Sequence, residues 1–167
     1  MQHNFALSTE SGQIFGYDAR NMSKPLFEKH AHESACSQVQ FSPHIPNMMV
    51  TSGTDGYVKV WDISQGQPME VASRDVKQGE LFTLQFCQDI PWVVAAGGSK
   101  GELAVWDMSE SKKIESHFKS NIIGDSYKKT DYDPAEPGND EMDDAGAEKE
   151  TDDYEDLPDS DDEEMEE

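Results

Sequence analysis

Short runs of alternating apolar and polar residues, separated by glycine, proline and other turn-forming residues, fill the first 120 positions of the chain. Tyr57–Asp62 is typical: Val58 and Val60 fall on one face of the expected strand, and Lys59 and Trp61 on the other. No segment before residue 131 shows a sustained helical period. The pattern predicts an all-β body.

Six further strands follow from the same alternation. Ser42–Asn47 contains two prolines, which cannot donate to a ladder of hydrogen bonds, so a strand must end there. Asp55-Gly56 supplies the positive φ that a tight hairpin turn requires. The additional expected strands are Cys36–Phe41, Met48–Ser52, Met69–Arg74, Leu81–Cys87, Trp92–Ala96 and Glu102–Asp107.

An internal repeat of about 45 residues organises these strands. An aromatic residue followed by Asp ends three segments, at Tyr17-Asp18, Trp61-Asp62 and Trp106-Asp107. The pairs are 44 and 45 residues apart. A four-stranded propeller blade that ends in Trp-Asp has a period of roughly 40–45 residues, so the repeat predicts about two and a half blades of a β-propeller.

The repeat resembles the WD-repeat family over residues 4–118. In that family a His, a Ser or Thr, an Asp of the tight turn and the Trp form a buried hydrogen-bond network within each blade. The resemblance implies such a network in the middle unit, built from His32 (or His30), Thr51 or Ser52, Asp55 and Trp61. Loss of one member is expected to cost about 1–3 kcal/mol, because its partners lose their hydrogen bonds.

The neighbouring units depart from the family pattern. Lys100 and Ser11 stand where the middle unit has Asp55, and Ser73–Gly79 contains no His. These outer units are expected to lack the network and to depend on packing alone, with Tyr17 and Trp106 as their blade-end aromatics.

Within the family, Leu7–Asp107 resembles the C-terminal part of the periodic tryptophan protein 1 family. Ser73–Phe82 carries this resemblance best, because it replaces the usual Gly-His element. The resemblance implies a nuclear, largely nucleolar scaffold of ribosome biogenesis (rRNA processing and pre-ribosome assembly), associated with chromatin and without catalytic activity; a cytoplasmic location stays open. A propeller needs at least four blades. The chain is therefore expected to be part of a larger gene product, a short isoform or an incomplete gene model, or to complete its propeller with another chain.

Charge divides the chain into a nearly neutral body and an acidic tail. The formal net charge is -22, yet residues 131–167 hold 20 acidic residues against one Lys, which leaves -3 for residues 1–130. We expect blades over residues 1–120, a linker over 121–130 and a disordered tail over 131–167. The excess of acid excludes nucleic-acid binding through net charge.

The tail has two interpretations. It is either a solubilising extension or a polyanion that shields basic ribosomal proteins or histones from nucleic acid. Ser160 lies among acidic residues and is a candidate substrate of an acidophilic, casein-type kinase.

Catalytic, metal and cofactor sites are not predicted. The five histidines lack cysteines at ligand spacing, and no phosphate loop or glycine-flanked nucleophile is present. Only two cysteines occur, and the sequence contains neither a signal peptide nor a run of about 20 apolar residues. We therefore expect a soluble intracellular protein that binds pre-ribosomal or basic proteins, with no membrane, cofactor or small-molecule substrate.

One short motif suggests a different function. Tyr17-Asp18-Ala19-Arg20 resembles the Trp-Asp-x-Arg box of WD-repeat substrate receptors for cullin-type ubiquitin ligases. The alternative is that Arg20 caps the strand end or pairs with Asp18.

Overall fold

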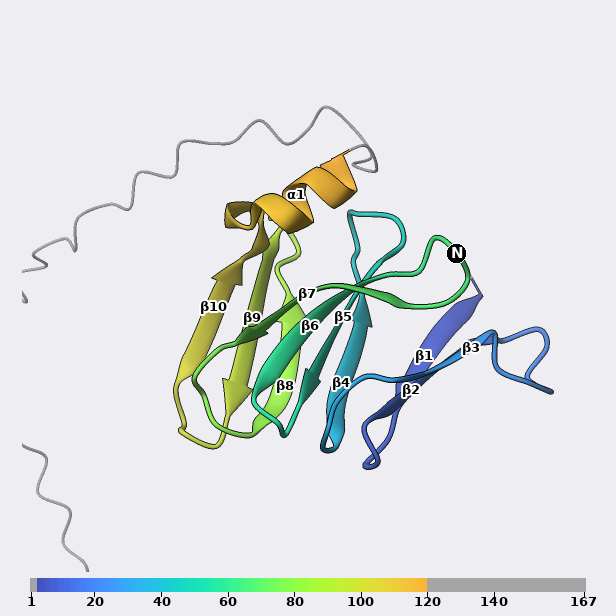
Figure 1. The fold of residues 1–167 in the computed structure, drawn as a ribbon, viewed down its shortest axis with the longest axis horizontal. Coiled ribbons are helices and arrows are strands. Elements are labelled where there is room, and N and C mark those ends of the chain that lie inside the picture. The colour runs from blue at the N-terminus through green and yellow to red at the C-terminus, as the bar shows by residue number, and fades with distance from the viewer. Residues whose placement is uncertain (1–2, 120–167) are drawn as a thin grey trace, which may run out of the picture. The chain divides into compact units, whose positions relative to one another are not determined.

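The computed structural model describes residues 3–119, which form three antiparallel sheets (Figure 1). In chain order the first sheet comprises β1 (Asn4–Ser8), β2 (Gln13–Asp18) and β3 (Phe27–His30). The middle sheet comprises β4 (Cys36–Phe41), β5 (Met48–Gly53), β6 (Tyr57–Asp62) and β7 (Met69–Asp75). The third sheet comprises β8 (Leu81–Phe86), β9 (Val93–Gly98) and β10 (Leu103–Asp107).

Each sheet is a meander in which neighbours in sequence are neighbours in space. The seven strands predicted from the sequence are all present, with ends shifted by one or two residues at most. Ten strands, at four to a blade, amount to two and a half blades. The predicted all-β propeller fold is confirmed for the described residues.

The middle sheet lies between the other two, and its two faces make different contacts. Met49 and Trp61 lie on one face, which packs against Ile14 and Phe27 of the first sheet. Val50, Val58 and Val60 lie on the opposite face, and they form one core with apolar side chains of the third sheet. We call these the tryptophan face and the valine face, and use the same terms for the corresponding faces of the other sheets. All six residues of β5 are buried, because a sheet covers each of its faces.

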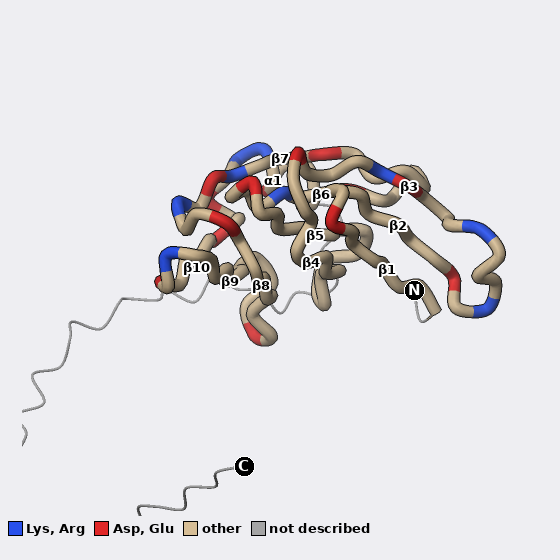
Figure 2. Tube along the Cα trace, turned by 90° about the horizontal axis from the view of Figure 1, so that it is seen from below, with Lys and Arg blue, Asp and Glu red and all other residues tan. Residues whose placement is uncertain are grey.

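Strands at the centre of the molecule carry no charged residues. β4, β5, β8 and β9 contain none, whereas β3 and β7 on the outer side contain both acids and bases (Figure 2). The opposite signs are interspersed along these outer strands, so the described body carries no large surface of one charge.

A short helix, α1 (Lys112–Phe118), corrects the expectation that the body lacks helical structure. It follows a single 3-10 turn, Met108–Glu110. Ile114 and Phe118, four residues apart, are both fully buried in the core shared by the middle and third sheets. A helix of two turns presents only these two apolar positions, which is too few to establish a helical period in the sequence.

The expected linker (121–130) and tail (131–167), with Ser160, lie outside the described residues.

Candidate functional site

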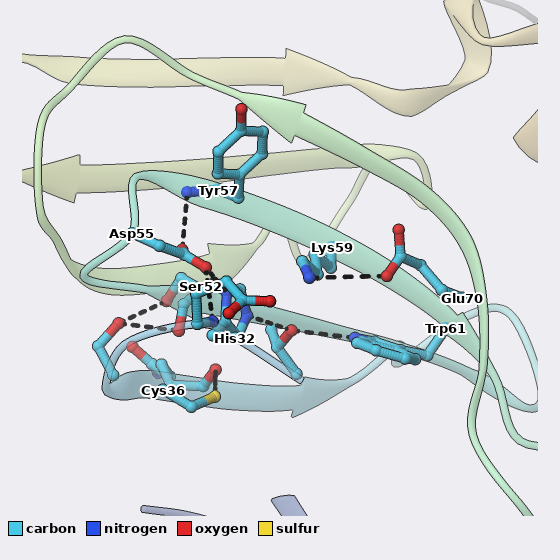
Figure 3. A network of polar contacts seen from close by, with 12 residues as sticks. His32, Cys36, Ser52, Asp55, Tyr57, Lys59, Trp61 and Glu70 are labelled. Carbon is cyan, nitrogen blue, oxygen red and sulfur yellow. Dashed lines mark hydrogen bonds and ion pairs between the residues drawn. The ribbon is translucent and has the colours of Figure 1, made fainter. Parts of the chain in front are cut away.

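A chain of hydrogen bonds crosses the middle sheet from Trp61 to the turn between β5 and β6 (Figure 3). The indole Nε1 of Trp61 donates to Thr51 Oγ1 at 3.0 Å. Thr51 Oγ1 lies 2.8 Å from His32 Nε2, and His32 Nδ1 lies 3.0 Å from each carboxylate oxygen of Asp55. Four side chains that are distant in the sequence therefore form one connected network.

The direction of each hydrogen bond follows from what each atom can donate. The indole of Trp61 only donates, so Thr51 Oγ1 accepts from it and has its own proton free for His32 Nε2. His32 Nδ1 then carries the ring proton and donates it to Asp55. This assignment satisfies all four groups with a neutral imidazole. Burial accordingly lowers the pKa of His32, against the opposing effect of the Asp55 carboxylate.

Asp55 also holds the ends of two loops together. Its Oδ2 accepts from the backbone N–H of Glu33 at 3.3 Å, and its Oδ1 accepts from that of Tyr57 at 3.1 Å. Gly53 makes room for this arrangement, because a Cβ at that position would lie 2.5 Å from His32 Nδ1 and 2.7 Å from an Asp55 oxygen. Sequence analysis missed the role of Gly53, since only the packed structure shows how closely the ring approaches it.

The structure distinguishes the alternatives left open by the sequence. Thr51 supplies the hydroxyl, whereas Ser52 lies on the other face of β5 and bonds Ser37, with 2.9 Å between the hydroxyls. His32 is the histidine of the network, and His30 is exposed at the end of β3.

Burial determines whether Thr51, His32 and Asp55 could act as a catalytic triad. A hydroxyl, an imidazole and a carboxylate in series are also the components of a nucleophilic triad. Here Thr51 is 0% and His32 1% exposed, and the hydroxyl already accepts from Trp61. No substrate carbonyl can approach it, so this geometry stabilises the blade and does not support acyl transfer. Cys36 beside it is no nucleophile either, because burial raises the pKa of its thiol to about 12.

Comparison with known proteins agrees with this blade geometry. Residues 23–62, which include all four network residues, match the family model described as "WD domain, G-beta repeat". These residues form a WD repeat.

Two curated relatives are similar to part of the chain. An uncharacterized WD repeat-containing protein of Schizosaccharomyces pombe is 37% identical over 82 residues, which cover 49% of this chain and 16% of the relative. The periodic tryptophan protein 1 homolog of Drosophila melanogaster is 27% identical over 77 residues, covering 46% of this chain and 17% of that protein. The predicted resemblance to the periodic tryptophan protein 1 family is therefore confirmed, over a segment that spans about a sixth of each relative.

A solved structure supports the fold. A chain of the mitotic checkpoint complex crystal structure superposes with a TM-score of 0.57 at 16% identity, covering 65% of this chain and 33% of that one. At this identity the likeness concerns the fold alone.

The third sheet has other residues at the positions of the network. At the constant spacing of 45 residues, Ala96 stands where the middle sheet has Thr51, Lys100 where it has Asp55 and Lys77 where it has His32. The buried Gln78 lies beside Gly98, which is the counterpart of Gly53. Lys100 Nζ donates to the carbonyl oxygen of Lys77 at 2.7 Å. The expectation that this blade depends on packing alone is wrong, because Lys100 joins the turn to the preceding loop by a surface hydrogen bond of reversed polarity.

The aromatic residues that end the outer blades have different surroundings. Tyr17 stacks on Phe5 with 5.7 Å between ring centroids. Trp106 is 5% exposed and lies beneath the guanidinium of Arg74, 5.4 Å from the ring centroid.

The residues of the possible ligase-adaptor box pair with each other. Arg20 donates to both carboxylate oxygens of Asp18, at 2.9 and 2.6 Å. The guanidinium holds the pKa of the Asp18 carboxyl well below its usual range. The Arg20 side chain is 69% exposed. The box is thus accessible at the end of β2, but its arginine already has a carboxylate partner.

Sequence analysis missed two sets of contacts between elements. Gln38 and Gln40 of β4 accept from backbone N–H groups of β8, at 2.9 and 3.1 Å. Asp62 Oδ2 accepts from Nε2 of His117 at 2.8 Å, which ties α1 to the middle blade. Burial by itself raises the pKa of Asp62, but hydrogen bonds from His117 and Ser64 outweigh it and hold that pKa below its usual value. The sequence does contain a signal for the first set: Gln38 and Gln40 stand at alternate positions of one expected strand, so both side chains point to the same neighbour.

Metal and membrane sites find no support in the described part of the chain. Residues 3–119 contain no group of three or more His, Cys, Asp or Glu side chains placed to hold a metal ion. Over the same residues, no helix has both the length and the apolar character needed to cross a bilayer.

Proposed function

We propose that this WD-repeat protein is a non-catalytic scaffold of nuclear, largely nucleolar ribosome biogenesis, which binds pre-ribosomal proteins during rRNA processing and particle assembly. Similarity to a periodic tryptophan protein 1 homolog is the observation that carries the proposal. Association with chromatin is part of the same proposal.

The chemistry of the blades is compatible with a scaffold. The triad-like arrangement of Thr51, His32 and Asp55 is closed to substrate, since Thr51 is fully buried. The outer strands and loops carry interspersed charges of both signs, which favour specific protein contacts over a general attraction to polyanions (Figure 2). WD-repeat propellers are in general protein-binding scaffolds.

Sedimentation of the full chain tests this proposal. An epitope-tagged chain expressed in cells is expected to sediment with pre-ribosomal particles and to co-purify precursor rRNA through proteins. Gly53→Val, which places a side chain against His32 and Asp55, is the matched variant that disrupts the middle blade and is expected to lose this association. If the wild-type chain stays in the fractions of free protein, and its depletion leaves rRNA processing unchanged, the proposal is wrong.

We further propose that the acidic residues 131–167 bind basic ribosomal proteins or histones. Twenty acidic residues against one Lys support an electrostatic contact that high salt weakens. Deletion of residues 131–167 is expected to abolish binding to purified basic proteins, whereas unchanged binding would contradict this role. Phosphorylation at Ser160 is expected to strengthen the contact, and Ser160→Ala is the control.

The second candidate function is a substrate receptor of a cullin-type ubiquitin ligase, for which Tyr17, Asp18 and Arg20 are the candidate residues. The exposure of Arg20 favours it, and the ion pair with Asp18 disfavours it. Arg20→Ala is expected to remove co-purifying ligase adaptors, and Lys24→Ala in the same loop is the control. Equal recovery of adaptors with wild type and Arg20→Ala excludes this function for the box.

A further inference from the structure

Helix α1 covers an apolar site at one end of the middle and third sheets, the end where β6 and β10 finish (Figure 1). Its buried residues, Ile114 and Phe118, are both 0% exposed. They belong to the same core as Ile45, Trp92 and Met108, which lie in the connections at this end of the two sheets. If α1 were absent, this end of the core would be an open apolar groove.

One polar contact adds to the two apolar ones. Asp62 Oδ2, at the end of β6, accepts from His117 Nε2 at 2.8 Å. The Asp62 side chain is only 9% exposed, so a donor at this position is worth more than it would be in water. The groove thus receives two large apolar side chains four residues apart, with a hydrogen-bond donor directly before the second.

The helix is separable from the sheets that it covers. It has seven residues, and a helix of this length is not stable alone in water. Ser111 at its N-cap makes no side-chain hydrogen bond to it. The ladders of the middle and third sheets pair strands with strands, so α1 can leave without breaking them. Burial of two side chains is opposed by the entropy of ordering seven residues, and the two quantities are of the same order.

We propose that the site under α1 is a groove for an amphipathic helix of another protein, and that the partner helix replaces α1. The partner carries the pattern that Ile114, His117 and Phe118 display: two large apolar residues four positions apart, and a hydrogen-bond donor directly before the second. Because α1 is tethered to the groove, it excludes helices that bind more weakly than α1 itself. This inference goes beyond the scaffold proposal and does not depend on a role in ribosome assembly.

Binding of an α1 peptide to the full chain is the test. The probe is a fluorescein-labelled peptide of residues 109–119, followed by fluorescence anisotropy. Ser116→Pro in the full chain breaks the helix, and Ser116 is exposed, so the core side chains are unchanged. We expect the peptide to bind the Ser116→Pro chain at least about tenfold more tightly than wild type. Ser116→Ala keeps the helix and is the matched control, expected to bind like wild type.

Variants of the peptide test the recognition pattern on the Ser116→Pro chain. Phe118→Ala in the peptide is expected to weaken binding by at least about tenfold, because it removes a fully buried ring. His117→Ala is expected to weaken it by about fivefold through loss of the hydrogen bond to Asp62. Lys113→Ala changes an exposed position and is expected to leave the affinity unchanged.

Four results would overturn the proposal. Urea unfolding followed by circular dichroism is expected to show that the sheets of the Ser116→Pro chain still unfold cooperatively. A Ser116→Pro chain that is unfolded would instead show that α1 is a required part of the core. Equal peptide affinity for wild type and Ser116→Pro, or a Phe118→Ala peptide that binds as tightly as the unchanged one, contradicts the groove. A wild-type chain that is dimeric, and that Ser116→Pro makes monomeric, would mean that α1 of a second copy fills the site.

Discussion

The middle and third sheets have the same strand order and the same Trp in the same register, but different polar chemistry. The corresponding residues, middle sheet first, are His32 and Lys77, Thr51 and Ala96, Asp55 and Lys100, and Trp61 and Trp106. In the middle sheet four side chains satisfy one another. In the loop before the third sheet, the side-chain carbonyl oxygen of Gln78 is buried without a hydrogen-bond partner.

This difference shows that the features that form the strands of a blade are not the same as the hydrogen bonds that further stabilise it. Alternating apolar residues and a glycine turn are sufficient for the strands of the third sheet, which has no His–Thr–Trp chain among its described hydrogen bonds. The network of the middle sheet adds satisfied polar groups within a dry core, where an unpaired group is costly. We therefore expect polar substitutions to have large effects in the middle sheet and small effects in the third.

Thr51→Val is expected to have the largest effect. Valine keeps the shape but removes the hydroxyl, which leaves both His32 Nε2 and Trp61 Nε1 without partners. Two groups left without hydrogen bonds, at about 1–3 kcal/mol each, predict a loss of about 2–6 kcal/mol in the free energy of unfolding. Urea denaturation measures it. Ser52→Ala is the control, since Ser37 still donates to the backbone oxygen of residue 52, and a loss as large as that of Thr51→Val would contradict the assignment.

Replacement of each Trp by Phe compares the two sheets directly. Trp61→Phe removes the indole donor to Thr51, and Trp106→Phe removes no hydrogen bond that the described structure contains. Both changes lose some apolar area, so the difference between them isolates the polar contribution. We expect Trp61→Phe to cost about 1 kcal/mol more than Trp106→Phe. Equal shifts in the urea midpoint would show that the network adds nothing.

Acidification is expected to weaken the middle sheet and not the third. The pKa of His32 is depressed from 6.5 because burial penalises the charged ring, so the unfolded chain takes up a proton first. The stabilisation by neutral His32 is complete above about pH 6.5 and is lost as pH falls through the folded pKa. Thermal unfolding from pH 8 to 5 is expected to show this loss in wild type. His32→Gln, which removes the titratable ring, is expected to be less pH-dependent between pH 6.5 and 5, and an identical pH profile would contradict it.

Gln78→Met is expected to have the smallest effect, with the opposite sign to Thr51→Val. Methionine has a similar volume and no carbonyl oxygen to leave unpaired. The free energy of unfolding is expected to stay unchanged or to rise by up to about 1 kcal/mol. A clear loss in the urea midpoint would mean that Gln78 makes a contact the third sheet needs.

The sequence was sufficient to predict the strands, but not the elements and contacts that depend on tertiary packing. Strands such as Cys36–Phe41 and Tyr57–Asp62 were predictable to the residue, because alternation and turn residues are local signals. Helix α1 was not, since Ile114 and Phe118 gain their burial only from the sheets above which the helix lies.

The candidate site shows the same limit. The repeat alone leaves both Thr51 and Ser52 as candidates, and only the register of β5 places one hydroxyl toward His32 and the other toward Ser37. The Lys100–Lys77 contact was not predictable, because it depends on the fold of a loop in which Lys77 adopts a positive φ.

Amide hydrogen exchange of wild type and Thr51→Val tests most directly whether the network stabilises the middle sheet. In wild type the amides of β5 and β6 are expected to exchange more slowly than those of β9 and β10. Thr51→Val is expected to accelerate exchange in β5 and β6, with little change in β9 and β10. If protection of β5 and β6 is unaltered by Thr51→Val, the network does not stabilise the middle sheet.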